Sequence, residues 1–221
     1  MKPHKFFTRT LEVVGVAGTG KTTLAHALAQ ADPSATYSRG LSRGQHPFSF
    51  ARHCLRACPD FLTALALGHD VRNEIADQIV IDTLGEVVGR GSERLIFDQG
   101  PLYRLARMQT LRGGDWWLSA VDHWSHLIDR VVWLDAPDDL LLDRVLTRDK
   151  PHRLKQLNST TAKDLLTDHR REYLELLDLI KETHPVSIVR FNTALHSTDQ
   201  IVAHLLRIGA NSLQPNSLRA A

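Results

Sequence analysis

A short run of small residues that ends in lysine and threonine constrains the fold of this chain more than any other feature. The eight residues from Gly15 to Thr22, GVAGTGKT, match the pattern G-x-x-x-x-G-K-[ST]. The pattern follows an apolar, strand-like run and precedes a helix-compatible segment, residues 23–29. Glycines let successive backbone amides point inward, and the start of the following helix adds partial positive charge. The sequence therefore predicts a phosphate-binding loop between a strand and a helix.

The side chains at the end of this loop have distinct predicted roles. Lys21 is expected to reach the β- and γ-phosphates of a nucleotide, and the Thr22 hydroxyl to hold Mg²⁺. Thr23 is a candidate contact to the α-phosphate. The predicted nucleotide-binding residues of the loop are Gly15, Ala17, Gly18, Thr19, Gly20, Lys21, Thr22 and Thr23.

Short β-type runs alternate with longer segments of helical spacing along the chain. The strand-like runs are residues 11–16, 36–38, 95–98, 130–134 and 186–190. Strands separated by helices predict an α/β protein with a parallel sheet. The 221 residues, 43% of them hydrophobic, are enough for one domain, which we expect over residues 1–209. Residues 210–221 lose the apolar periodicity and are expected to form a mobile tail.

Composition and charge exclude several classes of partner. Lys and Arg number 27 against 25 Asp and Glu, a balance that makes a nucleic-acid partner unlikely. The apolar runs fall far short of the roughly 18 to 20 residues that a membrane span needs, so no membrane partner is expected. Cys54 and Cys58 stand four residues apart and are interpreted as free thiols. We therefore expect a cytoplasmic protein.

A single acid ends the third strand-like run. The segment Arg94-Leu95-Ile96-Phe97 delivers Asp98 to the edge where open α/β sheets bind ligands. There Asp98 is a candidate Mg²⁺ ligand through the metal's water shell, and also a candidate general base for an attacking hydroxyl. The sequence leaves both roles open. In the alternative, structural interpretation, Asp98 only begins a turn with Gly100 and Pro101.

Two stretches without acidic residues follow predicted strands at the ligand edge. Residues 33–59 contain four arginines and no Asp or Glu, and residues 99–114 contain three more arginines. The planar guanidinium suits phosphate or carboxylate because it donates two parallel hydrogen bonds. About half of these arginines are expected on solvated helix faces. The candidates for binding an acceptor molecule are Arg39, Arg43 and Arg104.

A basic segment after the fourth strand-like run is typical of a lid. Helical spacing predicts that Arg144 and Arg148 lie one turn apart on the same face. The helix should break before Pro151. The segment of about residues 149–158, which includes Arg153, is expected to close over the nucleotide-binding site. Arginines in this position stabilise the charge that spreads over a moving phosphoryl group, so Arg144, Arg148 and Arg153 are catalytic candidates. An exposed basic helix end is the alternative.

Four segments together resemble the P-loop kinases of the nucleoside monophosphate kinase and thymidylate kinase group. They are GVAGTGKTT, FDQGP, VVWLDAPDDLLLDRVLTRDKPHR and DHRREYLELL, and the resemblance covers residues 11 to about 208. It implies a three-layer α/β sandwich with a five-stranded parallel sheet, ATP at the phosphate loop, and adenine contacts from Asn192 and Thr193. The residues after Asp98 differ from the acceptor signatures of thymidylate and deoxynucleoside kinases, so the acceptor stays open.

The sequence as a whole predicts an Mg-ATP-dependent kinase. Its acceptor would be a small molecule with a hydroxyl or phosphate to phosphorylate: a nucleoside, a nucleoside monophosphate or a specialised metabolite. The acid-free basic stretches favour an anionic acceptor. A nucleotide-dependent regulatory ATPase and, with less support, a polynucleotide end kinase are the alternatives. The preference for ATP or GTP and the oligomeric state, a homodimer included, stay open at this point.

Overall fold

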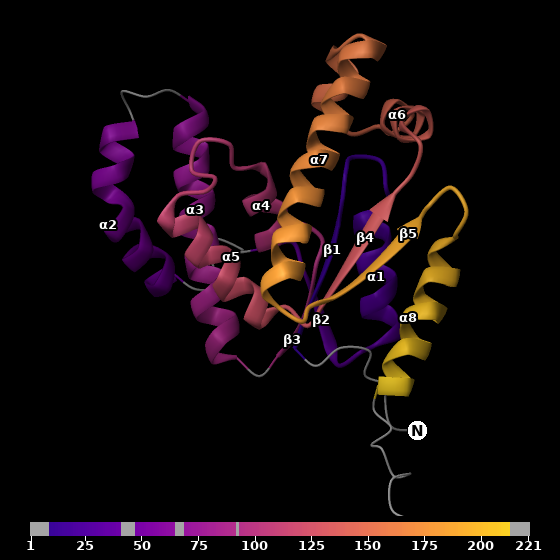
Figure 1. Cartoon of the computed structure of the whole chain (residues 1–221), viewed down its shortest axis with the longest axis horizontal. Coiled ribbons are helices and arrows are strands. Elements are labelled where there is room, and N and C mark those ends of the chain that lie inside the picture. Colours follow the sequence, from indigo (N-terminus) through magenta and orange to yellow (C-terminus); the bar gives the residue numbers. More distant parts are fainter. Residues whose placement is uncertain (1–8, 41–46, 65–68, 92, 213–221) are drawn as a thin grey trace, which may run out of the picture.

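A five-stranded parallel sheet forms the centre of the molecule (Figure 1). The computed structural model describes residues 9–40, 47–64, 69–91 and 93–212. The strands lie in the order β2-β3-β1-β4-β5, and every neighbouring pair is parallel. Their bounds are β1 Thr10–Gly15, β2 Ala35–Ser38, β3 Arg94–Phe97, β4 Arg130–Asp135 and β5 Ser187–Asn192. The predicted parallel α/β sheet is therefore confirmed.

Helices cover both faces of the sheet (Figure 1). One face carries α1 and α8, and the other carries α3, α4, α5 and α7. The helices are α1 Lys21–Ala31, α2 Pro47–Ala64, α3 His69–Arg90, α4 Pro101–Arg107, α5 Asp115–Leu127, α6 Asp138–Leu146, α7 Ser159–Thr183 and α8 Thr198–Ser212, with a 3-10 turn, η1, at Arg153–Gln156. This is the three-layer sandwich that the resemblance implied.

Alternation along the strands builds a separate core on each side of the sheet. Val13 and Ile96 pack toward α1 and α8, whereas Val14 and Phe97 pack toward the larger helical layer. The central strand β1 is buried along its whole length because it has a neighbour on either side and helices on both faces. Its one acidic residue, Glu12, is fully buried.

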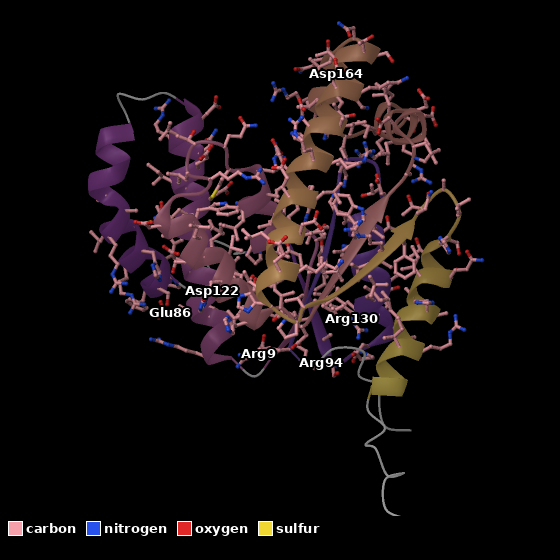
Figure 2. The ribbon with its side chains drawn as sticks, viewed as in Figure 1. Arg9, Glu86, Arg94, Asp122, Arg130 and Asp164 are labelled. Carbon is pink, nitrogen blue, oxygen red and sulfur yellow. The ribbon has the colours of Figure 1, made fainter. Side chains whose placement is uncertain are left out.

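The two edges of the sheet differ in chemistry. Figure 2 shows Arg9, Arg94 and Arg130 at the amino edge, far from Asp164 near the start of α7. Arg94 is tied there to the buried Asp32 by a 2.6 Å ion pair. The phosphate loop and the chain after β3 lie at the opposite, carboxyl edge, because all strands run the same way. Ligand chemistry is therefore expected at the carboxyl edge.

The ends of the chain fall partly outside the described residues. Helix α8 continues to Ser212, so the first three residues of the predicted tail, 210–212, are helical. Residues 213–221 lie outside the described part, and the division into a domain of residues 1–209 and a tail stays a prediction. No helix in the described ranges is long and apolar enough to cross a membrane.

Candidate active site

The loop between β1 and α1 has the backbone that a phosphate cradle needs. Gly15, Gly18 and Gly20 all have positive φ angles. A Cβ atom on Gly18 would lie 2.6 Å from the carbonyl oxygen of Leu141, so only glycine fits against α6 at this position. The buried Thr19 turns inward, and its hydroxyl donates to the carbonyl of Val16 at 2.9 Å. Thr19 thus braces the loop from inside.

Lys21 begins α1 and folds back over the loop. Its Nζ donates to the carbonyl oxygen of Val16 at 2.9 Å. Burial lowers the pKa of Lys21 to about 8; the negative charge of Asp98 opposes this shift, and the positive charges of Arg148 and Arg107 add to it. An anion at the loop would favour the charged form of this lysine.

Thr22 and Asp98 meet at the carboxyl edge. The Thr22 hydroxyl donates to Oδ2 of Asp98 at 2.6 Å, although 76 residues separate them in the sequence. Asp98 is fully buried, and its Oδ1 has no hydrogen-bond partner of normal geometry. The Tyr37 hydroxyl interacts with this carboxylate: burial, together with the negative charge of Asp98, raises the pKa of Tyr37 to about 12. The Thr22 hydroxyl and the Asp98 carboxylate form a pair of oxygen donors that fits Mg²⁺, which prefers oxygen ligands and keeps several waters.

A cavity of about 440 Å³ opens in front of the loop. Of the residues predicted from the sequence, it is lined by Gly15, Ala17, Gly18, Gly20, Lys21, Thr22, Thr23, Arg39, Arg148 and Arg153. Lys150 and His152 of the expected lid also line it. None of its lining residues, in the part of the chain that the structure describes, is Asp or Glu. The cavity is therefore suited to a strongly anionic ligand.

The lining residues that were not predicted include four polar side chains of α4 and α7: Tyr103, Arg107, His169 and Tyr173. Arg107 donates to the Tyr103 hydroxyl at 2.6 Å. The Tyr173 hydroxyl is buried without a hydrogen-bond partner, and burial raises its pKa well above the usual value. Burial, together with the positive charges of Arg107 and Arg153, lowers the pKa of His169 to about 4. The wall formed by α4 and α7 thus offers a hydroxyl and an uncharged imidazole beside a guanidinium.

Arg144 and Arg148 do not share a helix face, contrary to the expectation. Helix α6 ends at Leu146, where the Thr147 amide and hydroxyl both bond to the Asp143 carbonyl. Arg148 follows the helix end and lines the cavity. Arg144 turns elsewhere: it donates to Oγ1 and to the carbonyl oxygen of Thr193, each at 2.9 Å.

Asn192 and Thr193 lie where β5 ends. The Asn192 side chain accepts a 2.9 Å hydrogen bond from the amide of Ala194 and lines a second cavity of about 560 Å³. Thr193 is held by Arg144, whose Nη1 also lies 3.5 Å from the carbonyl oxygen of Gly18. The structure therefore brings Arg144 and Thr193, predicted separately, together beside the phosphate loop.

Two of the three candidate acceptor arginines, Arg39 and Arg104, lie in the part of the chain that the structure describes. Arg104 forms an ion pair with Asp77 on α3 and is absent from the residues that line the cavity. Arg43 lies outside the described residues. Of the two described candidates, Arg39, exposed after β2, is the one that lines the cavity. Trp117 and Trp124, on α5, belong to the core and do not line this cavity.

Glu12 is the main structural residue of the site that sequence reasoning missed. Its carboxylate accepts hydrogen bonds from the amides of Leu102 and Tyr103, at 3.0 and 2.9 Å. Burial raises the pKa of Glu12 to about 7, although these amides act in the opposite direction. A Cβ on Gly100 would lie 2.8 Å from Cδ of Glu12. Glu12 thereby fixes the turn after Asp98, and its only signal in the sequence is one acid inside an apolar strand.

Comparison with known proteins relates this arrangement to one fold. No protein-family model matches the chain, and no curated protein matches it in sequence. Similar solved structures include deoxyadenosine kinase from M. mycoides with bound dATP, at 12% identity and a TM-score of 0.53, covering 90% of this chain and 98% of that chain. Shikimate kinase from Acinetobacter baumannii in complex with shikimate has 18% identity and a TM-score of 0.53, with coverages of 93% and 96%.

A third similar structure is the YorR protein from Bacillus subtilis in complex with phosphorylated GDP. It has 12% identity and a TM-score of 0.55, and the match covers 90% of this chain and 94% of that chain. At these identities the likeness concerns the fold. The chain thus has the α/β fold of P-loop kinases, in agreement with the resemblance seen in its sequence.

Proposed function

We propose that this chain is an Mg-ATP-dependent kinase that transfers the γ-phosphoryl group of ATP to a small-molecule acceptor. The observation that carries the proposal is the contact between Thr22 and Asp98, 2.6 Å long, directly beside Lys21 and a basic cavity. It joins the phosphate loop to a buried acid at the edge of the sheet where α/β proteins bind ligands. This combination suits phosphoryl transfer, which depends mainly on positioning and on charge stabilisation.

The donor nucleotide would lie along the loop. Backbone amides from Gly15 to Thr23 bind its phosphates, and Lys21 exchanges its bond to the Val16 carbonyl for the β- and γ-phosphates. Arg144 holds Thr193 against the loop, so the base would lie near Thr193 and Asn192. In this proposal Arg144 shapes the base site, and Arg148 and Arg153 take the catalytic charge role.

Thr22 and Asp98 would hold Mg²⁺, the threonine directly and the aspartate through water. The bound ion would neutralise charge on the β- and γ-phosphates. Oδ2 of Asp98 already accepts the Thr22 hydroxyl, so Oδ1 is available for one further donor. That donor is either a water of the metal shell or the acceptor hydroxyl. If Oδ1 accepts from a water of the metal shell, loss of Asp98 should raise the Mg²⁺ concentration that the reaction needs. If Oδ1 accepts from the acceptor hydroxyl, loss of Asp98 should lower kcat even at saturating Mg²⁺.

The segment of residues 149–158 would act as the lid. Arg148 and Arg153 already line the same cavity as the phosphate loop, together with Lys150. Their charges would stabilise the phosphoryl group as negative charge spreads over its oxygens, and closure would exclude water.

The acceptor would bind between Arg39 and the wall of α4 and α7. Arg39, Arg107 and the unpartnered Tyr173 hydroxyl can bind a phosphate or carboxylate together with a neutral polar group. Proteins of this fold include kinases named for a nucleoside and for shikimate, so the fold accommodates more than one acceptor class. We therefore place nucleosides, nucleoside monophosphates and small hydroxy acids or sugar phosphates among the acceptors to test.

The proposal is tested by measuring ADP release from Mg-ATP by the purified chain. The chain is assayed alone and with pools of nucleosides, nucleoside monophosphates, hydroxy acids and sugar phosphates, while mass spectrometry follows any added phosphoryl group. We expect release that depends on one pool and a product heavier by one phosphoryl group. Lys21→Ala is the matched control and should release none. Hydrolysis that no pool changes would instead indicate a regulatory ATPase.

A further inference from the structure

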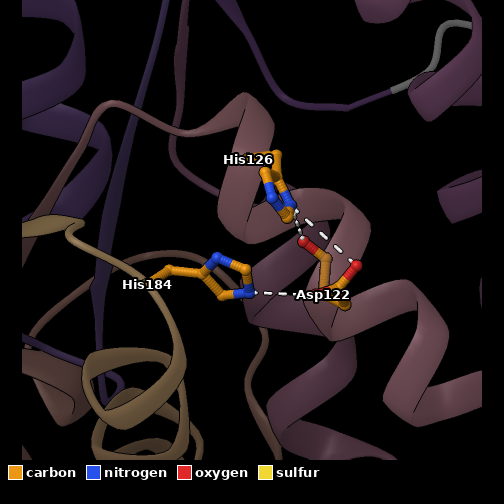
Figure 3. Close-up of side chains that lie close together, drawn as sticks. All are labelled: Asp122, His126 and His184. Carbon is orange, nitrogen blue, oxygen red and sulfur yellow. Dashed lines mark hydrogen bonds and ion pairs between the residues drawn. The ribbon is translucent and has the colours of Figure 1, made fainter.

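Three potential metal ligands meet far from the cavity. Asp122 and His126 lie on α5, and His184 follows α7 (Figure 3). One ring nitrogen from each histidine and one carboxylate oxygen all lie within 4.8 Å of one another. Nε2 of His184 is 3.0 Å from Oδ1 of Asp122, and Nδ1 of His126 is 3.9 Å from Oδ2.

The topology separates this cluster from the phosphate loop. Helix α5 leads into the start of β4 and α7 into the start of β5, and the first residues of these strands, Arg130 and Ser187, are paired. The cluster therefore lies at the amino edge of the sheet, whereas the phosphate loop is at the carboxyl edge. Figure 2 shows Asp122 at the same end of the molecule as Arg9 and Arg130. An ion bound here would take no part in phosphoryl transfer.

The donor set has the composition of a zinc site. Two imidazoles and one carboxylate match the three protein ligands of zinc sites that keep a fourth position for water. Asp122 and His126 are four residues apart on one helix and thus share a face. The rings of His126 and His184 are in contact, with centroids 4.3 Å apart, so both imidazoles lie beside the Asp122 carboxylate.

Hydrogen bonding prepares one of these ligands. Nδ1 of His126 lies 2.9 Å from the carbonyl oxygen of Asp122. A carbonyl oxygen only accepts, so this bond places the hydrogen on Nδ1 and leaves the lone pair on Nε2 free for a metal. Metal-binding histidines commonly donate their other ring N–H to such an oxygen.

The helix ends favour a cation at this place. His126 lies in the last turn of α5, and His184 is the C-terminal cap of α7, with its amide bonded to the Ile180 carbonyl. Both helices therefore direct the partial negative charge of their carboxyl ends toward the cluster. The side chain of His184 is only 11% exposed, whereas that of Asp122 is 66% exposed. The packed His184 would hold the ion in place, and an ion could reach the site from solvent on the Asp122 side.

We propose that Asp122, His126 and His184 bind one divalent transition-metal ion of the zinc type, with water in the fourth position. The ion would cross-link α5 to the carboxyl end of α7, the helix that carries His169 and Tyr173 at the cavity. Because it binds the folded chain, it would raise the free energy of unfolding by an amount that grows with the logarithm of its concentration above the Kd.

The test uses the full chain, without an affinity tag of histidines, after dialysis against EDTA. Isothermal titration with ZnCl2 is expected to give one site per chain, and Zn²⁺ is expected to raise Tm. His126→Ala and His184→Ala should each weaken Zn²⁺ binding by at least about tenfold. Loss of a residue that only supports a metal ligand already costs about 10- to 100-fold in affinity, and these residues are the ligands themselves. Asp122→Asn keeps an acceptor for His184, so it tests the carboxylate in a folded chain.

Controls separate this site from other donors. His204→Ala, on α8, should bind Zn²⁺ as the unmodified chain does. The free thiols Cys54 and Cys58 are replaced by serine in every variant, and Co²⁺ in that background should show d–d bands without thiolate charge transfer. Binding that survives His126→Ala, His184→Ala and Asp122→Asn unchanged would overturn the proposal, as would loss of the site in the serine background alone.

Discussion

The Thr22 hydroxyl, in the first turn of α1, donates a 2.6 Å hydrogen bond to the fully buried Asp98 at the end of β3. The contact connects two neighbouring strands through their side chains, because β1 ends in the phosphate loop and β3 ends in the acid. One oxygen of the carboxylate is used by this bond, and the other, Oδ1, has no hydrogen-bond partner of normal geometry, although the Tyr37 hydroxyl interacts with the carboxylate. The geometry thus presents one carboxylate oxygen without a normal hydrogen bond beside the loop.

Replacement of Asp98 tests this arrangement. In Asp98→Asn the amide oxygen still accepts the Thr22 hydroxyl, so the fold should be retained, whereas phosphoryl transfer should fall by roughly a hundredfold or more. The measurement is steady-state ADP release at several Mg²⁺ concentrations, with circular dichroism as the check on folding. Wild-type turnover in this variant would remove Asp98 from the mechanism.

The lowered pKa of Lys21 makes nucleotide binding depend on pH. With a pKa of about 8 in the empty site, Lys21 loses its charge as the pH rises above 8, and affinity for Mg-ADP should fall by up to about tenfold per pH unit. Fluorescence or calorimetric titration between pH 7 and 9.5 measures this slope. Lys21→Arg keeps its charge over that range and should show none of it; equal slopes in both proteins would contradict the prediction.

Replacing Arg144 and replacing Arg148 should change different kinetic parameters. Arg148 lines the cavity, so Arg148→Ala should lower kcat much more than nucleotide affinity. Arg144 holds Thr193, so Arg144→Ala should mainly weaken nucleotide binding. Parallel measurements of kcat and of the Kd for Mg-ADP separate the two effects. The assignment is wrong if Arg144→Ala loses turnover at full nucleotide saturation.

His169 should report the charge of the cavity. Its pKa of about 4 lies below the usual 6.5, so it is neutral at pH 7, and the fold loses stability as the pH falls from 6.5 to 4. Nuclear magnetic resonance of the ring protons, assigned with His169→Gln, gives the titration midpoint. Mg-ADP should raise this midpoint, and so should Arg153→Gln in the empty protein. A midpoint at 6.5 or above in the empty protein would contradict the prediction.

Glu12 should make stability depend on pH in the opposite sense. Its folded pKa of about 7 exceeds the usual glutamate value of 4.5, so its contribution to stability is full below pH 4.5 and is lost as the pH rises to 7. Denaturant unfolding of Glu12→Gln should show a flatter profile across that window. Glu12→Ala leaves the amides of Leu102 and Tyr103 without acceptors and should cost about 1–3 kcal/mol.

The local parts of the site could be predicted because their signals are short in sequence. The residues from Gly15 to Thr22 contain the loop pattern, and an apolar run leads directly to Asp98. Both segments lie at the expected edge of the sheet, and the strands begin and end within two residues of the predicted positions. Patterns of this kind are complete within ten residues, so no distant contact is needed to recognise them.

Other parts depend on contacts that no short segment contains. Arg104 turns to Asp77 on another helix, and Glu12 meets amides that lie 90 and 91 residues later. Helix α6 ends at Leu146 although the next proline is Pro151, and this early end separates Arg144 from Arg148. The roles of these side chains depend on partners that the fold brings near them from other elements, and nothing in the neighbouring sequence identifies those partners.

The contact between Glu12 and Gly100 constrains how chains of this kind can diverge. A Cβ at position 100 would lie 2.8 Å from the Glu12 carboxyl carbon and 2.7 Å from Cβ of Phe97. Any side chain at position 100 therefore requires a smaller residue at position 12 and a shift of β3. A protein that has changed at only one of these two positions should be less stable than one that has changed at neither or at both. Positions 12 and 100 should consequently vary together among homologous sequences, as a coupled pair that links the central strand to the turn after the acid.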